Sequence, residues 1–165
     1  MARFQSAASA EKRDITVNDL LVHTSGQGYE FFSADDLKYR TAKAIPTVVS
    51  CTFASIRTML LHDPGERWTY GPNIDWLGRI VEQQRGKRLG EVFAERIFGP
   101  LGMSDIAFTM NDSMRARRAV IHDRAADGKL TPLPDLILPQ PPEMDMGGHG
   151  LYARSEERRV GKECA

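Results

Sequence analysis

Tyr70 is the residue of this 165-residue chain whose setting most suggests chemistry. It lies in the segment PGERWTYGPNIDWLG (64–78), between a Pro64-Gly65 turn and the first turn of an amphipathic helix. A phenol has a pKa of about 10, so it is a poor proton acceptor at neutral pH unless a nearby cation favours the phenolate. A tyrosine at this place can also simply cover the start of the helix. The segment alone leaves both interpretations open.

Two other groups of residues have spacings that suggest nucleophilic chemistry. Ser9 and Lys12 stand three positions apart, which would place a hydroxyl and an ammonium one helical turn apart. We interpret that spacing as chance, because residues this common produce it in many chains. His23 and Ser25, in the sequence HTSG, resemble part of a catalytic triad, but at a helix end we expect them to cap and turn the chain.

No metal or cofactor site is expected. No pair among the four histidines has the i, i+4 helical spacing of zinc sites; they are His23, His62, His122 and His149. The glycine-rich segment 147–150 is not followed by Lys-Ser/Thr, so it is no phosphate loop. We expect it to form a tight bend near the rim of a cleft, with glycine required by the backbone at several positions.

Periodic apolar residues, together with capping and stop residues, predict five helices. They run from about Thr16 to Gly26, Ser33 to Pro46, Thr47 to Pro64, Asn73 to Gly86 and Leu89 to Gly99. Asn73 is expected to cap the fourth helix. One face of that helix carries Ile74, Leu77, Ile80, Val81 and Gln84.

The region after residue 103 has the character of short strands. DIAFTM (105–110) and RAVIHDR (118–124) are the predicted strands, and Asp127-Gly128 is a hairpin turn between VIHDRA and KLTPL. Residues 132–142 hold five prolines, which predicts an extended surface connection outside any helix or sheet.

Composition limits the chain to one domain with a hydrophobic core. Hydrophobic residues make up 41% of it, and 22 Lys and Arg balance 22 Asp and Glu, so nothing favours nucleic acid or an anionic membrane as a partner. No apolar run reaches the length of a membrane span, and the first residues lack a secretory signal, so a cytoplasmic location is the default expectation. Cys51 and Cys164 are expected to be free, reduced thiols.

Four segments together resemble the serine β-lactamase and penicillin-binding-protein superfamily, and most closely its carboxylesterases related to class C β-lactamases. They are 16–26, 64–78, FAERIFGPLGMSDIAF (93–108) and GGHGLYA (147–153). The resemblance implies an α+β fold of the β-lactamase/transpeptidase type, of which residues 15–154 would supply mainly the α-helical domain and a small antiparallel hairpin. It also implies an acyl-transferring serine hydrolase that acts on a small ester or amide.

The resemblance assigns Tyr70 the role of proton-transfer residue in the active-site cleft. A serine hydroxyl is a weak nucleophile, so a base must take its proton and later return it to the leaving group. Trp68, Asn73, Gly148 and His149 are the candidate substrate-binding residues, although Asn73 is better explained as a helix cap and Trp68 as an aromatic residue of the core or the cleft wall. Pro72 stands where β-lactamases carry an asparagine that binds the substrate amide, which favours an esterase.

Two motifs of the superfamily have no match. The first is the Ser-x-x-Lys turn that would carry the nucleophile and the cation: Ser9 and Lys12 have its spacing, but they lie just before Ile15, where the superfamily has a helix and a long connection. The second is the late Lys-Thr-Gly or Trp-Gly-Gly strand. We therefore expect a fragment, with residues 1–14 as a poorly ordered leader. The tail SEERRVGKECA (155–165) has six charged residues among eleven, offers no apolar face, and is expected to be non-native.

Two hypotheses remain. The chain is a partial serine hydrolase, inactive by itself because its nucleophile is absent, or it is a noncatalytic helical binding module or truncated product. In either case a helical domain without most of its sheet would expose apolar surface that drives self-association.

Overall fold

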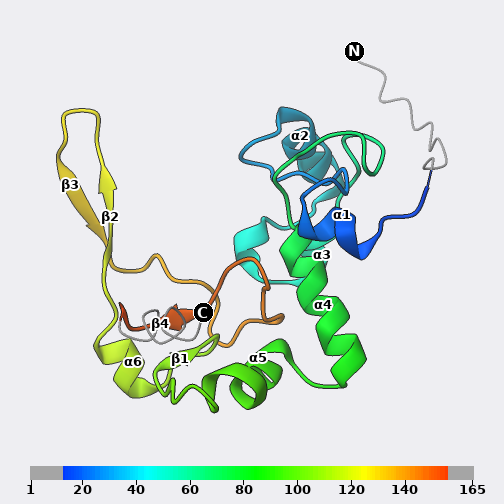
Figure 1. Ribbon diagram of the computed structural model, residues 1–165. Coiled ribbons are helices and arrows are strands. Elements are labelled where there is room, and N and C mark those ends of the chain that lie inside the picture. The colour runs from blue at the N-terminus through cyan, green and yellow to red at the C-terminus, as the bar shows by residue number, and fades with distance from the viewer. Residues whose placement is uncertain (1–12, 156–165) are drawn as a thin grey trace.

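The computed structural model describes residues 13–155, so the predictions on Ser9, Lys12, Cys164 and nearly all of the leader and tail lie outside the described residues. In chain order its elements are α1 (Val17–Leu21), α2 (Ala34–Lys43), η1 (Val48–Ser50), α3 (Phe53–Ile56), α4 (Asn73–Arg85), α5 (Leu89–Phe93), η2 (Ala94–Phe98), β1 (Ile106–Ala107), α6 (Asp112–Ala116), β2 (Ile121–Arg124), β3 (Leu130–Leu133) and β4 (Tyr152–Ala153). In Figure 1, α4 connects the region of α1 to α3 with the region of α5 and α6.

α1 begins where its capping box predicts. The Thr16 hydroxyl accepts a hydrogen bond from the Asp19 N–H, and the Asp19 carboxylate accepts one from the Thr16 N–H at 2.9 Å. Arg13 donates two further hydrogen bonds to that carboxylate, at 2.7 and 2.8 Å. The helix ends earlier than predicted, because the chain already turns at His23, whose φ is 58°.

The predicted helix over residues 47–63 is wrong. That stretch holds only η1 and the four-residue α3, with Cys51 in the left-handed region between them at a φ of 52°. β-Branched residues disfavour a continuous helix there. The buried Arg40 of α2 instead donates to the carbonyl oxygens of Pro46, at 3.0 Å, and Ser55, at 2.7 Å, which fixes the segment as a folded loop.

The fourth helix is confirmed as α4, but its start and its buried face differ from the prediction. Pro72 is the N-cap residue and Asn73 the first helical residue, whose side chain makes no capping hydrogen bond. The buried positions are Asn73, Asp75 and Gly78, whereas Ile80 on the predicted apolar face is 37% exposed. α4 therefore buries two polar side chains in its first turn, whereas its apolar side chains are only partly buried or exposed.

Two small antiparallel pairs form the sheet structure. β2 and β3 make the predicted hairpin, with His122 opposite Pro132 and Gly128 in the turn at a φ of 85°. The hairpin projects away from the rest of the chain in Figure 1, and its strands are almost wholly exposed. Residues 132 and 133 belong to β3, so the proline-rich connection starts later than predicted. Proline is accepted there because β3 is an edge strand.

The main core lies where α4 meets the loops around it. Its buried members are Tyr29, Val48, Cys51, Ile56, Met144 and Met146. Helices combined with small antiparallel sheets match the expected α+β fold class. Within residues 13–155 no helix is both long and apolar enough to cross a bilayer.

Candidate functional site

Tyr70 lies on the surface, on a segment whose backbone is held at both sides. The Thr69 N–H donates to the His23 carbonyl at 2.9 Å, and the Thr69 hydroxyl pairs with the His62 ring at 2.8 Å. Gly71 packs so closely on the chain at Gln27 that a Cβ there would lie 2.4 Å from the Gln27 carbonyl oxygen. The Tyr70 side chain is 43% exposed, so its ring is not sealed in the interior.

Aromatic rings surround Tyr70. The Tyr70 ring lies 5.0 Å from that of His23 and 5.3 Å from that of Tyr29, measured between centroids, and Trp68 stacks on it at 6.2 Å with an interplanar angle of 12°. Phe32 completes the group at 6.2 Å. We call His23, Tyr29, Phe31, Phe32, Trp68 and Tyr70 the aromatic cluster. Trp68 and Phe32 are 64% and 72% exposed, so the cluster offers a rigid apolar surface to a ligand or to another chain.

A buried polar network supports this cluster from below. The Ser25 hydroxyl donates to the Asn73 side-chain oxygen, and the Asn73 amide nitrogen donates to His23 Nδ1 at 2.9 Å. An amide nitrogen can only donate, so Nδ1 accepts and His23 is neutral. Burial also lowers the pKa of His23 below its usual value. Asn73, with no exposed surface, therefore orients His23 and cannot reach a ligand.

Asp75 is the second anchor of the site and is completely buried. Its carboxylate accepts hydrogen bonds from the Gly148 N–H at 2.8 Å and from the Tyr29 hydroxyl at 3.4 Å, and His149 Nδ1 lies 3.8 Å away. Burial raises the pKa of Asp75, and the Gly148, His149 and Tyr29 contacts oppose that shift. Burial and the Asp75 charge likewise raise the pKa of Tyr29.

Gly148 and His149 thus meet the start of α4, as a cleft-rim loop would. Residues 147 and 148 are glycines because a side chain would not fit there, whereas the sequence predicted a backbone conformation that only glycine adopts. A Cβ on Gly147 would lie 2.3 Å from the Ile74 carbonyl oxygen, and one on Gly148 would lie 3.2 Å from the Asp75 carboxylate. Within the glycine-rich segment 147–150, Gly150 alone adopts a positive φ, of 97°.

Cys51 lies on the far side of His149, with its Sγ 3.7 Å from Nε2. Asp75, His149 and Cys51 form a chain of contacts that looks like a nucleophilic triad. However, Cys51 is only 1% exposed and burial raises its pKa to about 11, so the thiol is protonated at neutral pH. Within the described part of the chain no three acidic, His or Cys side chains could hold a metal ion.

The structure therefore divides the predicted residues into two connected groups. Tyr70 and Trp68 lie in the aromatic cluster, while Gly148 and His149 lie around Asp75. Tyr29 connects the groups, since its ring contacts Tyr70 and its hydroxyl binds Asp75. Sequence reasoning missed Asp75 and Tyr29. An acidic residue in the first turn of a helix is usual for electrostatic reasons, so Asp75 gave no sign of its burial.

Comparison with known proteins identifies the family. The profile of the Beta-lactamase family matches residues 3–157, nearly the whole chain, and extends past the expected 15–154 at both ends. The chain belongs to this family, which confirms the resemblance found in the sequence.

The individual relatives include an acyltransferase and an esterase. It is 32% identical over 158 residues to "Monacolin J acid methylbutanoyltransferase" of Aspergillus terreus, covering 91% of this chain and 38% of that protein. It is 34% identical over 152 residues to "Lovastatin esterase" of Penicillium rubens, covering 85% of this chain and 37% of that protein. The chain thus spans less than two fifths of the length of these relatives.

Solved structures agree. A mutant of simvastatin synthase from Aspergillus terreus superposes with a TM-score of 0.77 at 31% identity, covering 92% of this chain and 36% of that one. "EstCE1, a hydrolase with promiscuous acyltransferase activity" has a TM-score of 0.67 at 24% identity, covering 87% and 43%, and supports the fold alone. Both confirm a β-lactamase/transpeptidase-like fold.

Proposed function

We propose that this chain is part of a serine hydrolase or acyltransferase that cleaves small carboxylic esters through an acyl-serine, with Tyr70 as the proton-transfer residue. The observation that carries the proposal is the half-exposed Tyr70 phenol, held on a fixed backbone beside an open aromatic surface. By their names, one relative transfers a methylbutanoyl group and another is a lovastatin esterase, and an apolar acyl group fits such a surface.

In the proposed reaction a serine oxygen attacks the ester carbonyl carbon, and its proton moves to the Tyr70 phenolate. The carbon–oxygen bond to the alcohol then breaks, and Tyr70 returns the proton to the departing alkoxide. Water or a second alcohol attacks the acyl-serine in the same way. The nucleophilic serine would belong to the Ser-x-x-Lys motif of the superfamily, a role that the proposal does not give to Ser9, because its spacing to Lys12 is interpreted as chance.

The phenolate needs a cation beside it, and the rings around Tyr70 do not supply one. His23 is neutral because its Nδ1 accepts from Asn73 and burial lowers its pKa. The lysine of the missing motif would provide the charge. His23, Asn73 and Asp75 are then positioning residues. Asn73 orients the His23 ring, which contacts the Tyr70 ring, and Asp75 holds Tyr29 on the other side of Tyr70.

The substrate class follows from Pro72 and the aromatic cluster. Pro72 is buried and has no side-chain donor, so it cannot bind a substrate amide as an asparagine would. Trp68 supplies an apolar wall for an acyl group. These features favour esters over β-lactams or D-Ala amides.

A chimera tests the function. Residues 15–154 replace the equivalent segment of the Penicillium rubens lovastatin esterase, which supplies the missing motifs. We expect a burst of nitrophenol from nitrophenyl butyrate and labelling by a fluorophosphonate probe in the chimera, and neither in the present chain alone. A folded chimera without burst or labelling would favour the noncatalytic binding module.

A further inference from the structure

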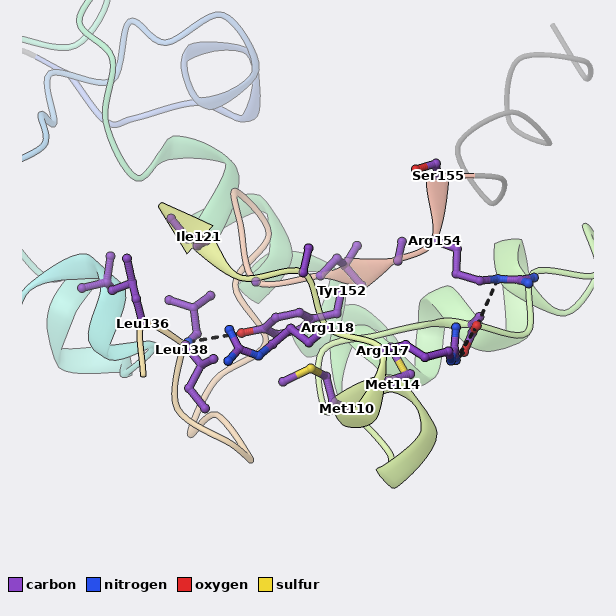
Figure 2. A pocket seen from close by; sticks show the side chains of 17 residues that line it. Met110, Met114, Arg117, Arg118, Ile121, Leu136, Leu138, Tyr152, Arg154 and Ser155 are labelled. Carbon is purple, nitrogen blue, oxygen red and sulfur yellow. Dashed lines mark hydrogen bonds and ion pairs between the residues drawn. The ribbon is translucent and has the colours of Figure 1, made fainter. Parts of the chain in front are cut away.

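A cavity of about 820 Å³, apart from the candidate site, lies between β4, α6 and the connection that follows β3 (Figure 2). Its volume falls within the range of about 300–1,000 Å³ that small-molecule sites occupy. None of its lining residues belongs to the aromatic cluster or contacts Asp75, so the inference below does not depend on the proposed acyl chemistry.

One side of this cavity is apolar and adaptable. Met110 and Met114 are 4% and 8% exposed and lie along its base with Leu138 and Tyr152. The Tyr152 hydroxyl accepts a hydrogen bond from the Leu138 N–H at 3.2 Å, which fixes the aromatic wall. Methionine side chains fill irregular spaces and tolerate flexible ligands. This side therefore fits a hydrocarbon chain better than a planar or polar group.

The lining of this cavity also carries positive charge. Asp105 is shared by Arg117, at 2.7 Å, and Arg154, at 3.0 Å. Arg118 donates to the Pro134 carbonyl, which is neutral and leaves its charge uncompensated by that contact. Three arginines and one aspartate line the cavity, so its lining carries a net charge of 3 − 1 = +2. A guanidinium fork matches the two oxygens of a carboxylate.

We propose that this cavity binds an amphipathic carboxylate of the medium-chain fatty acid type. Its head group lies at Arg118, and its alkyl chain lies along Met110, Met114 and Leu138.

The test uses the full chain and dansylaminoundecanoate, a fluorescent fatty acid, with its uncharged amide as the neutral counterpart. We expect saturable binding of the carboxylate that is about tenfold tighter than that of the amide, since a charge-assisted hydrogen bond is lost with the charge. In competition, decanoate should be about tenfold weaker than dodecanoate, because two methylene groups leave the apolar wall.

Matched variants separate the cavity from the rest of the surface. Arg118→Gln should weaken carboxylate binding five- to tenfold and leave amide binding unchanged, whereas Arg124→Gln on the hairpin should change neither. Leu136→Asp places a negative charge in the cavity and should abolish binding. Leu136 and Leu130 are 52% and 49% exposed, so Leu130→Asp, outside the cavity, is a control of equal folding risk.

Three results would overturn the proposal. One is equal affinity for carboxylate and amide, and another is equal loss of binding in Leu130→Asp and Leu136→Asp. The third is a concentration-dependent dimer that Leu136→Asp dissociates while the carboxylate does not bind, which would assign the cavity to a second copy of the chain.

Discussion

The Asp75 carboxylate accepts a hydrogen bond from the Gly148 N–H at 2.8 Å, although the two residues stand 73 positions apart. This contact joins the first turn of α4 to the glycine-rich loop. The other carboxylate oxygen binds the Tyr29 hydroxyl, and the Tyr29 ring contacts Tyr70. One buried carboxylate thus holds together the two parts of the candidate site.

Removal of Asp75 should therefore loosen both parts at once. Asp75→Ala leaves the Gly148 N–H and the Tyr29 hydroxyl without their acceptor, and we expect it to lower the free energy of unfolding by about 3 kcal/mol. Asp75→Asn keeps one acceptor oxygen and removes a buried charge, so we expect a loss of about 1 kcal/mol. Urea denaturation followed by circular dichroism measures both, with the exposed Asp112→Asn as control. Equal stability of Asp75→Ala and the parent chain would show that the contact is not structural.

His23 should make stability depend on pH. Burial lowers its pKa in the folded state, so below the usual value of 6.5 the unfolded state binds more protons. The free energy of unfolding should then fall as the pH decreases from 7 to 5. His23→Asn keeps an acceptor for Asn73 and tolerates the left-handed backbone, and should reduce this slope. The exposed His122→Asn serves as control, and an unchanged slope in His23→Asn would contradict the assignment of a neutral, partly buried imidazole.

Gly147 should tolerate no side chain. A Cβ there would lie 2.3 Å from the Ile74 carbonyl oxygen, and backbone on both sides prevents an easy adjustment. We expect Gly147→Ala to cost about 2–3 kcal/mol by forcing the loop away from α4. Gly86→Ala has open space around it and only the strain of a φ of 64°, so it should cost about 1 kcal/mol. Thermal unfolding of both variants gives the comparison, and a loss in Gly147→Ala no larger than that in Gly86→Ala would contradict the steric role of Gly147.

The exposed aromatic cluster should make the chain associate with itself. Phe32 and Trp68 are among its most exposed large apolar side chains, and the apolar face of α4 is also partly open. We expect sedimentation coefficients that rise with concentration and fall again in the double variant Phe32→Ser/Trp68→Ser. Leu130→Ser on the hairpin is the control. A monomer with a sharp, concentration-independent thermal transition would contradict this prediction.

Local residue patterns predicted the parts of the fold that local contacts decide. The capping boxes, the Asp127-Gly128 turn and the Gly86 stop involve neighbours in sequence, so they could be found without the structure. The helix predicted over residues 47–63 was wrong because Arg40, a residue of another helix, decides the path of this segment. Arg40 donates hydrogen bonds to the carbonyl groups of Pro46 and Ser55.

The candidate site was predictable only in part, for the same reason. Tyr70, Trp68, Gly148 and His149 came from the family resemblance, and the structure brings them into two adjoining groups. The roles of Asn73 and Asp75 depend on burial by distant segments, which helical periodicity does not report. The apolar residues of α4 are only partly buried, because the start of that helix docks through polar contacts to Ser25, His23 and Gly148.

The most direct test is the rate of acyl-enzyme formation in the chimera with the lovastatin esterase, measured by stopped flow with nitrophenyl butyrate. Tyr70→Phe should slow acylation by about a hundredfold to ten-thousandfold with a similar KM, because proton transfer is lost while the ring remains. Tyr39→Phe, on α2, should keep the parent rate. Acylation within twofold of the parent in Tyr70→Phe would contradict the assignment of Tyr70 as the proton-transfer residue.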